Sequence, residues 1–83
     1  MDAEKIILFG SRARGDYNEE SDFDLFVVME TAKEEMEQGL DIRKSLDNFD
    51  HSIDLLLVTP KHFQEGFLLK EVILEDGVTI YER

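Results

Sequence analysis

The sequence predicts an α/β fold, with a small mixed β-sheet of about four strands and helices packed on it. Three short apolar runs, at residues 6–9, 25–29 and 53–58, have the length and the β-branched content of buried strands. Helical patterns follow the second and third runs, at residues 32–49 and 60–74. Because a helix between two strands normally forms a right-handed crossover, the second and third strands should be parallel.

The first strand is expected at Lys5–Phe9 and stops at Gly10, where a glycine allows the backbone to turn. Residues 12–15 should form a short helical turn, with Ser11 as its N-cap type. Free backbone N–H groups and a hydroxyl at such a turn make a natural cradle for a phosphate. The connection to the next strand is short, so the first strand should run antiparallel to the second.

Two carboxylates, Asp22 and Asp24, stand at the head of the second strand, which continues through Met29. Side chains two apart on a strand leave by the same face, so both carboxylates should aim at one point. Their repulsion calls for a cation between them, and oxygen ligands suit Mg²⁺ or Mn²⁺ better than zinc. The apolar run that follows lacks polar alternation, which predicts a central strand covered on both faces.

A helix is predicted to begin at Ala32, because Thr31 and Glu34 form a capping box. Gly39 weakens this helix by about 1 kcal/mol relative to alanine and allows a bend. At 3.6 residues per turn, one apolar face should contact the sheet. Its residues are Ala32, Met36, Leu40, Ile42, Leu46 and Phe49.

Asp54 is the charged residue of the third strand, at residues 53–58. A carboxylate at the head of a buried strand needs a cation, a metal or helix-end donors as its partner. Because the second and third strands are expected to be parallel, Asp54 should lie at the same edge of the sheet as Asp22 and Asp24. Without a cation, at least one of the three should hold its proton to unusually high pH.

The last third of the chain predicts a helix and a final strand. Thr59 is an N-cap type and Pro60 suits the first helical position, so a helix should run from there toward Leu74. Gly66 is expected to divide it into two short helices. After a turn at residues 76–77, residues 78–81 read as a short edge strand. His51 and His62 stand in polar surroundings and are interpreted as surface residues.

The length and the net charge of the chain limit the number of domains and the kinds of molecule that it can bind. With 83 residues, 1–83 is expected to be a single domain. Twenty acidic against nine basic residues give a formal charge of −11, which opposes binding to nucleic acid. Nucleotide binding stays open, since a divalent metal would mediate it. The absence of cysteine excludes disulfides and thiolate zinc sites but does not indicate the compartment. Because the sequence shows no signal-like start and no apolar run of membrane-spanning length, a cytoplasmic protein without membrane contact is expected.

The segment from Gly10 to Leu25 resembles the signature of a known family. Gly10-Ser11, ten intervening residues and Asp22-Phe23-Asp24 are similar to the motif of the nucleotidyltransferase superfamily that includes DNA polymerase β and the kanamycin nucleotidyltransferases. The fuller string, G-S-R-A-R-G followed by S-D-F-D-L, resembles the minimal nucleotidyltransferases of bacteria and archaea. This extended string is far more specific than an isolated G-S or D-x-D.

The resemblance implies a palm-like nucleotidyltransferase fold and a role for each motif residue. Gly10 and Ser11 would hold the β- and γ-phosphates of a nucleoside triphosphate, and the three carboxylates would bind two Mg²⁺ ions, with Mn²⁺ as a substitute. Asp22 and Asp24 would bind both ions, and Asp54 the catalytic one. The family usually places a helix before the first strand, and four residues stand there in this sequence. That difference predicts an uncovered flank of the sheet.

Two arginines in the motif have two interpretations. Arg12 and Arg14 could contact the nucleotide phosphates, which would place them with the nucleotide-binding residues. They could equally pair with acidic residues of the following loop, which are Asp16, Glu19 and Glu20.

The resemblance also implies a reaction and a partner. Minimal nucleotidyltransferases are often paired with a HEPN-domain toxin and transfer AMP from ATP to a toxin tyrosine, acting as the antitoxin. One alternative is a catalytically silent antitoxin that binds and occludes its partner. Another is a metal-binding domain without transfer activity. The uncovered flank predicts that the chain forms a homodimer or binds its partner there.

Overall fold

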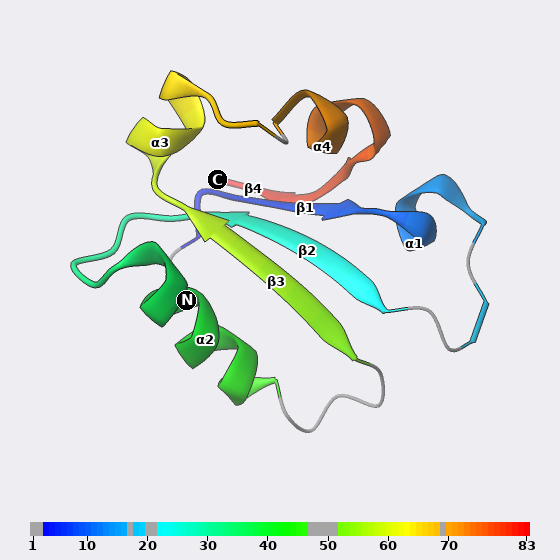
Figure 1. Cartoon of the computed structure of the whole chain (residues 1–83), viewed down its shortest axis with the longest axis horizontal. Helices are drawn as coiled ribbons and strands as arrows, with labels where there is room; N and C mark the ends of the chain where they lie inside the picture. The colour runs from blue at the N-terminus through cyan, green and yellow to red at the C-terminus, as the bar shows by residue number, and fades with distance from the viewer. Residues whose placement is uncertain (1–2, 17, 20–21, 47–51, 69) are drawn as a thin grey trace.

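The computed structural model describes residues 3–16, 18–19, 22–46, 52–68 and 70–83, which are built around a four-stranded sheet (Figure 1). Its strands lie in the order β3-β2-β1-β4. They are β1 (Lys5–Phe9), β2 (Phe23–Val28), β3 (Ile53–Val58) and β4 (Val78–Glu82). The helices are α1 (Ser11–Arg14), α2 (Glu35–Ser45), α3 (Pro60–Glu65) and α4 (Lys70–Asp76).

The sheet is mixed, as predicted. β1 is antiparallel to both β2 and β4, whereas β2 and β3 are parallel and connected through α2. β2 lies between β1 and β3, and its residues 26–28 are buried. The predicted central position of this strand, and the edge position of the last strand, are therefore confirmed.

Helices cover the sheet from both sides (Figure 1). Alternate residues of β2 point to opposite faces. Phe26 and Val28 belong to a buried cluster into which α3 and α4 pack, completed by Ile7, Val58, Ile73, Phe9, Phe63 and Phe67. Val27 belongs to a second cluster on the α2 side, with Ala3, Met29, Leu57, Ile6, Ile42 and Leu55.

The predicted start of the second helix is wrong. α2 begins at Glu35, and Ala32 is exposed ahead of it. The Thr31 hydroxyl accepts a hydrogen bond from the backbone N–H of Lys33 at 3.1 Å and donates one to Gln38 Oε1 at 2.9 Å. Thr31 thus stabilises a local turn instead of capping a helix, which is a conformation that threonine also favours.

The predicted apolar face of α2 is wrong in its first half. Met36 and Leu40 are 79% and 52% exposed. Gly39 is the buried position of the helix, and a Cβ placed on it would meet side-chain atoms of Leu55 and Leu57 at 3.5 and 3.7 Å. The helix therefore approaches β3 through its smallest residue, which turns Met36 and Leu40 toward solvent.

The division of the third helical segment at Gly66 is confirmed, since α3 ends at Glu65 and α4 begins at Lys70. The Thr59 side chain caps α3 by accepting a hydrogen bond from the His62 backbone N–H at 3.2 Å. Among the described residues, no helix has the length and apolar character that crossing a bilayer requires.

Apolar side chains of β1 and β4 lie beside an open groove of about 300 Å³. Val78, Ile80 and Tyr81 of β4 are 51%, 55% and 46% exposed. These side chains and the groove form an exposed apolar surface on this part of the sheet. The groove is lined by Leu8, Phe23, Leu25, Leu46, Ile53 and Ile80.

Candidate active site

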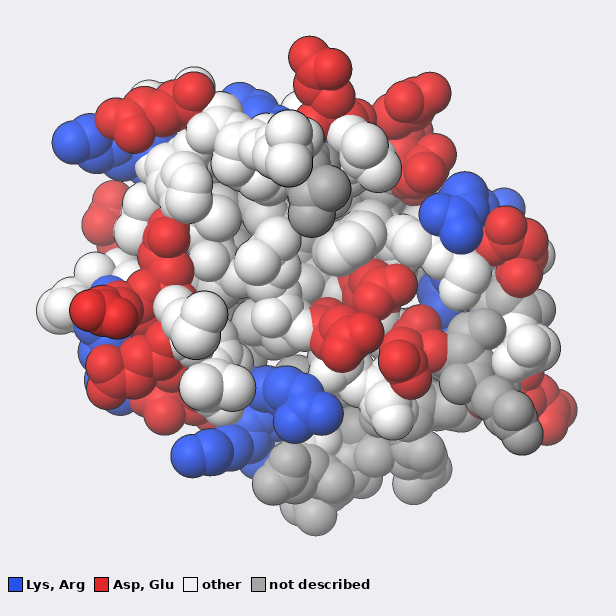
Figure 2. Space-filling model, in the orientation of Figure 1, with Lys and Arg blue, Asp and Glu red and all other residues white. Residues whose placement is uncertain are grey.

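Three chain segments meet where β1 ends and where β2 and β3 begin. Asp24 is the register partner of Phe9 in the antiparallel pair and of Asp54 in the parallel pair. The backbone N–H of Phe23 donates to the carbonyl of Ser52 at 2.9 Å, which fixes the starts of β2 and β3 side by side. Figure 2 shows acidic side chains gathered over this end of the two strands.

Gly10 forms the turn that faces Asp24. Its φ is +76°, a region that side chains with a Cβ rarely occupy, and a Cβ there would lie 2.1 Å from Asp24 Oδ2. The Gly10 carbonyl accepts hydrogen bonds from Ala13 and Arg14, both at 3.1 Å, so Ser11 opens α1. The structure therefore brings the predicted glycine-serine turn and Asp24 together.

The electrostatics of the site centre on Asp24. Its pKa is raised above the ordinary value of 3.8 by burial, by the charges of Asp54 and Asp22, and by a side-chain hydrogen bond with Asp54. The charge of Arg14 acts in the opposite direction. The raised pKa of Asp24 has the direction that was predicted for one of the three carboxylates.

The two motif arginines have different surroundings. Arg14 Nε lies 3.3 Å from Asp16 Oδ2, and Arg14 Nη1 lies 3.6 Å from Asp76 Oδ2. The expected pairing with the acidic loop is therefore seen for Asp16, while Asp76 was not anticipated. The Arg12 guanidinium carbon lies 4.2 Å from the centroid of the Phe23 ring. Glu20, Phe49 and His51, which also entered the predictions, lie outside the described residues.

The donor set can be tested against a divalent cation. Carboxylate oxygens from Asp22, Asp24 and Asp54 are hard ligands, and their mutual repulsion raises the pKa of Asp24. A cation between them would relieve that repulsion, so the chemistry of these residues fits Mg²⁺ or Mn²⁺. Within the described ranges, no three histidine, cysteine or acidic side chains are already arranged as a metal site. Metal binding would therefore require these carboxylates to adjust their side chains.

A hydrogen-bonded pair that sequence reasoning missed lies at the opposite end of β3. His62 Nδ1 is 2.9 Å from Glu35 Oε2, and that oxygen also accepts the backbone N–H of Thr59 at 2.8 Å. Burial favours a higher pKa for Glu35, but the hydrogen bonds from Thr59 and His62 outweigh it and lower the pKa.

This pair joins the start of α2 to the start of α3. His62, interpreted from sequence as a plain surface residue, is thus half-buried and partnered. Periodicity carried no signal for the pair, because the two residues belong to different elements and lie 27 positions apart.

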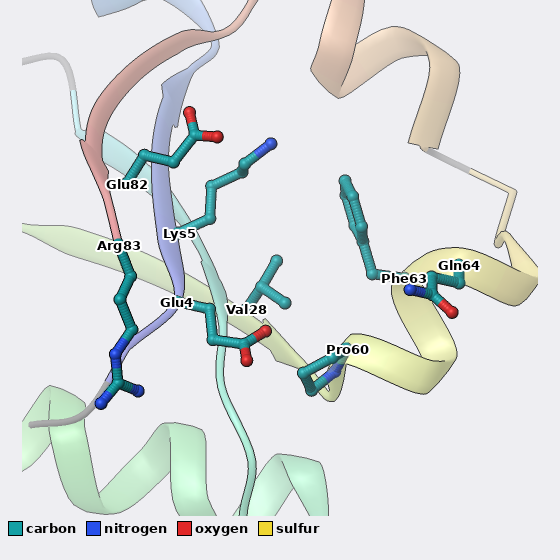
Figure 3. A pocket seen from close by; sticks show the side chains of 8 residues that line it. All are labelled: Glu4, Lys5, Val28, Pro60, Phe63, Gln64, Glu82 and Arg83. Carbon is teal, nitrogen blue, oxygen red and sulfur yellow. The ribbon is translucent and has the colours of Figure 1, made fainter.

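A cavity of about 290 Å³ lies beside the other end of β1 and β2 (Figure 3). Lys5 and Phe63 face each other across it, with Lys5 Nζ 5.6 Å from the ring centroid. Lys5 pairs with Val28 in the sheet register, four positions along the strands from the Phe9 and Asp24 pair, or roughly 13 Å away. The cavity is therefore separate from the carboxylates. Its lining is completed by Glu4, Pro60, Gln64, Glu82 and Arg83.

A mixed sheet that brings carboxylates from two neighbouring strands to a glycine-serine turn agrees with the arrangement that the resemblance to nucleotidyltransferases implied. The sequence assigns the chain more closely. The chain belongs to the nucleotidyltransferase domain family, whose sequence profile matches residues 2–80.

Two curated relatives come from Methanocaldococcus jannaschii, and both carry the name "Putative protein adenylyltransferase". One is 75% identical over 24 residues, which are 29% of this chain and 24% of the relative. The other is 40% identical over 57 residues, which are 65% of this chain and 54% of the relative. The matches thus span about a quarter and about half of the lengths of these relatives.

A solved structure shares the fold. The crystal structure of a toxin–antitoxin with AMP-PNP matches with a TM-score of 0.65 at 21% sequence identity. The match covers 100% of this chain and 64% of that chain. At this identity the likeness supports the nucleotidyltransferase fold.

Proposed function

We propose that this domain, acting in the cytoplasm, transfers AMP from ATP onto a hydroxyl group of a partner protein. The proposed acceptor is a tyrosine of a HEPN-type toxin, which would make the domain an antitoxin. Its family membership supports nucleotidyl transfer. The names of the two curated relatives support a protein acceptor, and the toxin–antitoxin neighbour supports a toxin as that protein.

One observation supports the proposal more than any other, and it is the contact between the Gly10 turn and Asp24. A triphosphate held by the Gly10-Ser11 backbone would lie directly against the carboxylate that burial and two like charges leave electrostatically unsatisfied. Both groups are negatively charged, so this contact becomes favourable when a divalent cation lies between them.

The residues take separate roles in the proposed reaction. Gly10 and Ser11 hold the β- and γ-phosphates, while Arg12 and Arg14 supply positive charge beside the nucleotide. The acceptor oxygen attacks the α-phosphorus in line, its bond to phosphorus forms, and the bond to the bridging oxygen breaks so that pyrophosphate leaves. Asp54 accepts the proton that the acceptor hydroxyl loses.

Asp22, Asp24 and Asp54 would hold Mg²⁺ at this site. When bound there, the cation would neutralise charge that develops on the phosphoryl group being transferred. The acidic chain itself offers little attraction to a nucleotide, since its formal charge is −11.

The exposed apolar side chains of β4, together with the apolar groove beside them, are the proposed contact surface for the partner, or for a second copy of the chain. A groove lined only by apolar side chains favours an apolar contact there. This assignment places the partner on the sheet face that α2 leaves partly open.

The test is incubation with α-labelled ATP, Mg²⁺ and the toxin candidate encoded beside the gene. Wild type should label the toxin, and EDTA should prevent labelling. Asp24→Asn should reduce labelling by at least about 100-fold, which corresponds to about 2.7 kcal/mol of lost transition-state stabilisation. Glu37→Gln, at an exposed position of α2, removes the same charge away from the site and serves as the control.

The outcomes separate the proposed activity from its alternatives. Labelling that persists in Asp24→Asn would contradict the assignment of the carboxylates. A chain that binds and inhibits the toxin without labelling it would be the silent antitoxin that acts by occlusion. A chain that binds Mg²⁺ but neither nucleotide nor toxin would be a metal-binding domain without transfer activity.

A further inference from the structure

Arg14 is held between carboxylates from two different parts of the chain. Asp16 follows it in the loop after α1 and lies 3.3 Å from Arg14 Nε. Asp76 is the last residue of α4 and lies 3.6 Å from Arg14 Nη1. The guanidinium therefore contacts carboxylates through two of its three nitrogen atoms, and its charge acts on Asp24 as well.

Asp76 occupies a rigid position. Ile73 of α4 is buried against Ile7 of β1, and the Gly77 N–H donates to the Ile73 carbonyl at 2.7 Å. A Cβ on Gly77 would lie 2.3 Å from that carbonyl oxygen and 2.4 Å from Ile7 Cγ2. The chain on both sides of Asp76 thus packs closely on β1, so the backbone at Asp76 is held by the core, whereas Asp16 belongs to a loop.

A carboxylate is also an unfavourable choice at the end of a helix. The last turn of α4 exposes backbone carbonyls, which favour positive side chains, yet that turn contains no basic residue. Residues that oppose the local preference often serve a function instead. At Asp76, the contact with Arg14 is the interaction that explains the acidic side chain.

Arg14 keeps donors for a ligand while it contacts both carboxylates. A guanidinium carries five N–H groups, and within the described part of the chain the two contacts engage Nε and Nη1, so Nη2 can donate to a phosphate oxygen. The Arg14 side chain is 46% exposed, so a nucleotide can reach it.

We propose that Asp76 is a positioning residue that holds the Arg14 guanidinium in place for the triphosphate. This inference rests on the proposed function, because it assumes that a nucleoside triphosphate binds at the Gly10-Ser11 turn. Asp76 itself does not touch the nucleotide. By restricting the Arg14 side chain to the conformation that binds the nucleotide, Asp76 reduces the conformational entropy that is lost on binding. The position of the end of α4 therefore affects nucleotide affinity.

The test compares two neighbouring charge removals. Isothermal titration with Mg²⁺ and α,β-methylene-ATP, which cannot transfer its AMP, measures nucleotide binding without catalysis. Asp76→Asn should weaken binding about fivefold, whereas Glu75→Gln should leave it unchanged or slightly tighter. Both variants remove one negative charge from an acidic protein, which alone would favour an anionic ligand. A loss of affinity confined to Asp76→Asn is therefore the signature of positioning.

Two further variants complete the test. Asp76→Glu should recover most of the affinity, because it restores a carboxylate. Asp76→Asn should cost nothing more in an Arg14→Gln background, since the two residues act as one unit. Binding by Asp76→Asn that is as tight as wild type, or tighter, would overturn the inference alone. A wild-type chain that binds no nucleotide would overturn the proposed function together with it.

Discussion

Gly10 and Asp24 are in direct contact across the end of the β1 and β2 pair, with no room between them for a methyl group. Gly10→Ala should therefore both strain the backbone and push the Asp24 carboxylate from its place. With φ +76° and ψ −159°, Gly10 lies in a region that is essentially confined to glycine, so alanine there should cost about 1–3 kcal/mol, and the clash adds to that cost. Urea unfolding should show the lost stability, and the labelling assay should show a loss of at least about 100-fold.

Gly15 provides a control for the clash with Asp24, although its ψ of 4° places it in the left-handed helical region, where Gly10 does not lie. It also has positive φ, at +86°, but a Cβ there would meet no atom within 4 Å. Gly15→Ala should therefore show the backbone cost alone and keep most of the transfer activity. Equal losses of activity in both variants would mean that the contact with Asp24 is unimportant.

Asp24 predicts a pH dependence with a definite sign. Its pKa in the folded state is raised above 3.8, so the folded chain binds more protons than the unfolded chain between 3.8 and the raised value. Without metal, stability should fall as pH rises through this window, and the loss should be complete above the folded pKa. Asp24→Asn should remove this loss and unfold at higher temperature than wild type in EDTA at pH 7.

In Mg²⁺, wild type should unfold at a higher temperature than Asp24→Asn. Metal at about 100 times its dissociation constant should stabilise wild type by about 2.7 kcal/mol, and Asp24→Asn by much less. Melting curves in EDTA and in Mg²⁺ measure both effects. An Asp24→Asn variant that melts below wild type in EDTA would contradict the crowding of carboxylates at this site.

The contribution of Glu35 to stability should depend on pH in the opposite direction. Because hydrogen bonds from Thr59 and His62 lower its pKa below 4.5, its contribution is present above pH 4.5 and is lost as pH falls through the lowered folded value. Glu35→Gln should cost about 1–3 kcal/mol at pH 7, because the Thr59 N–H and the His62 ring lose their charged acceptor. Denaturant curves at pH 7 and pH 3 should show this difference shrinking in acid, whereas Glu37→Gln should change little at either pH.

Gly39 predicts a stabilising substitution. A Cβ there would meet Leu55 and Leu57 at 3.5 and 3.7 Å, which are ordinary van der Waals distances. Gly39→Ala should gain about 0.5–1 kcal/mol from helix propensity and from a less flexible unfolded chain. A rise in the urea midpoint without a change in slope would show it. Destabilisation would mean that α2 must approach β3 more closely than alanine permits.

The strands and the core of the site could be predicted because their determinants are local. Apolar runs, interrupted in the third by Asp54, marked β1, β2 and β3. Gly10 follows the first run, and Asp24 and Asp54 stand at the heads of the next two strands, which placed these residues at one edge. The parallel pairing followed from the helix between two of these strands.

The remaining features depend on contacts between distant elements. Thr31 and Glu34 satisfy the rule for a helix start, but Glu35 makes its hydrogen bonds across to α3, and the helix begins there instead. Close approach at Gly39 likewise depends on β3, and the approach of Asp76 to Arg14 depends on how α4 packs on β1. Local sequence patterns do not indicate which residues of distant elements will come into contact.

The parallel pairing of Asp24 with Asp54 also has a kinetic consequence. The two carboxylates become neighbours only after the chain has closed the long crossover through α2 and formed the β2 and β3 pair. Such non-local pairing is the slow part of folding, because closing the loop lowers the entropy of the chain before the stabilising contacts between the strands have formed. A refolding chain should therefore regain its Mg²⁺ affinity together with its final tertiary structure. Mg²⁺ binding would then report when folding is complete.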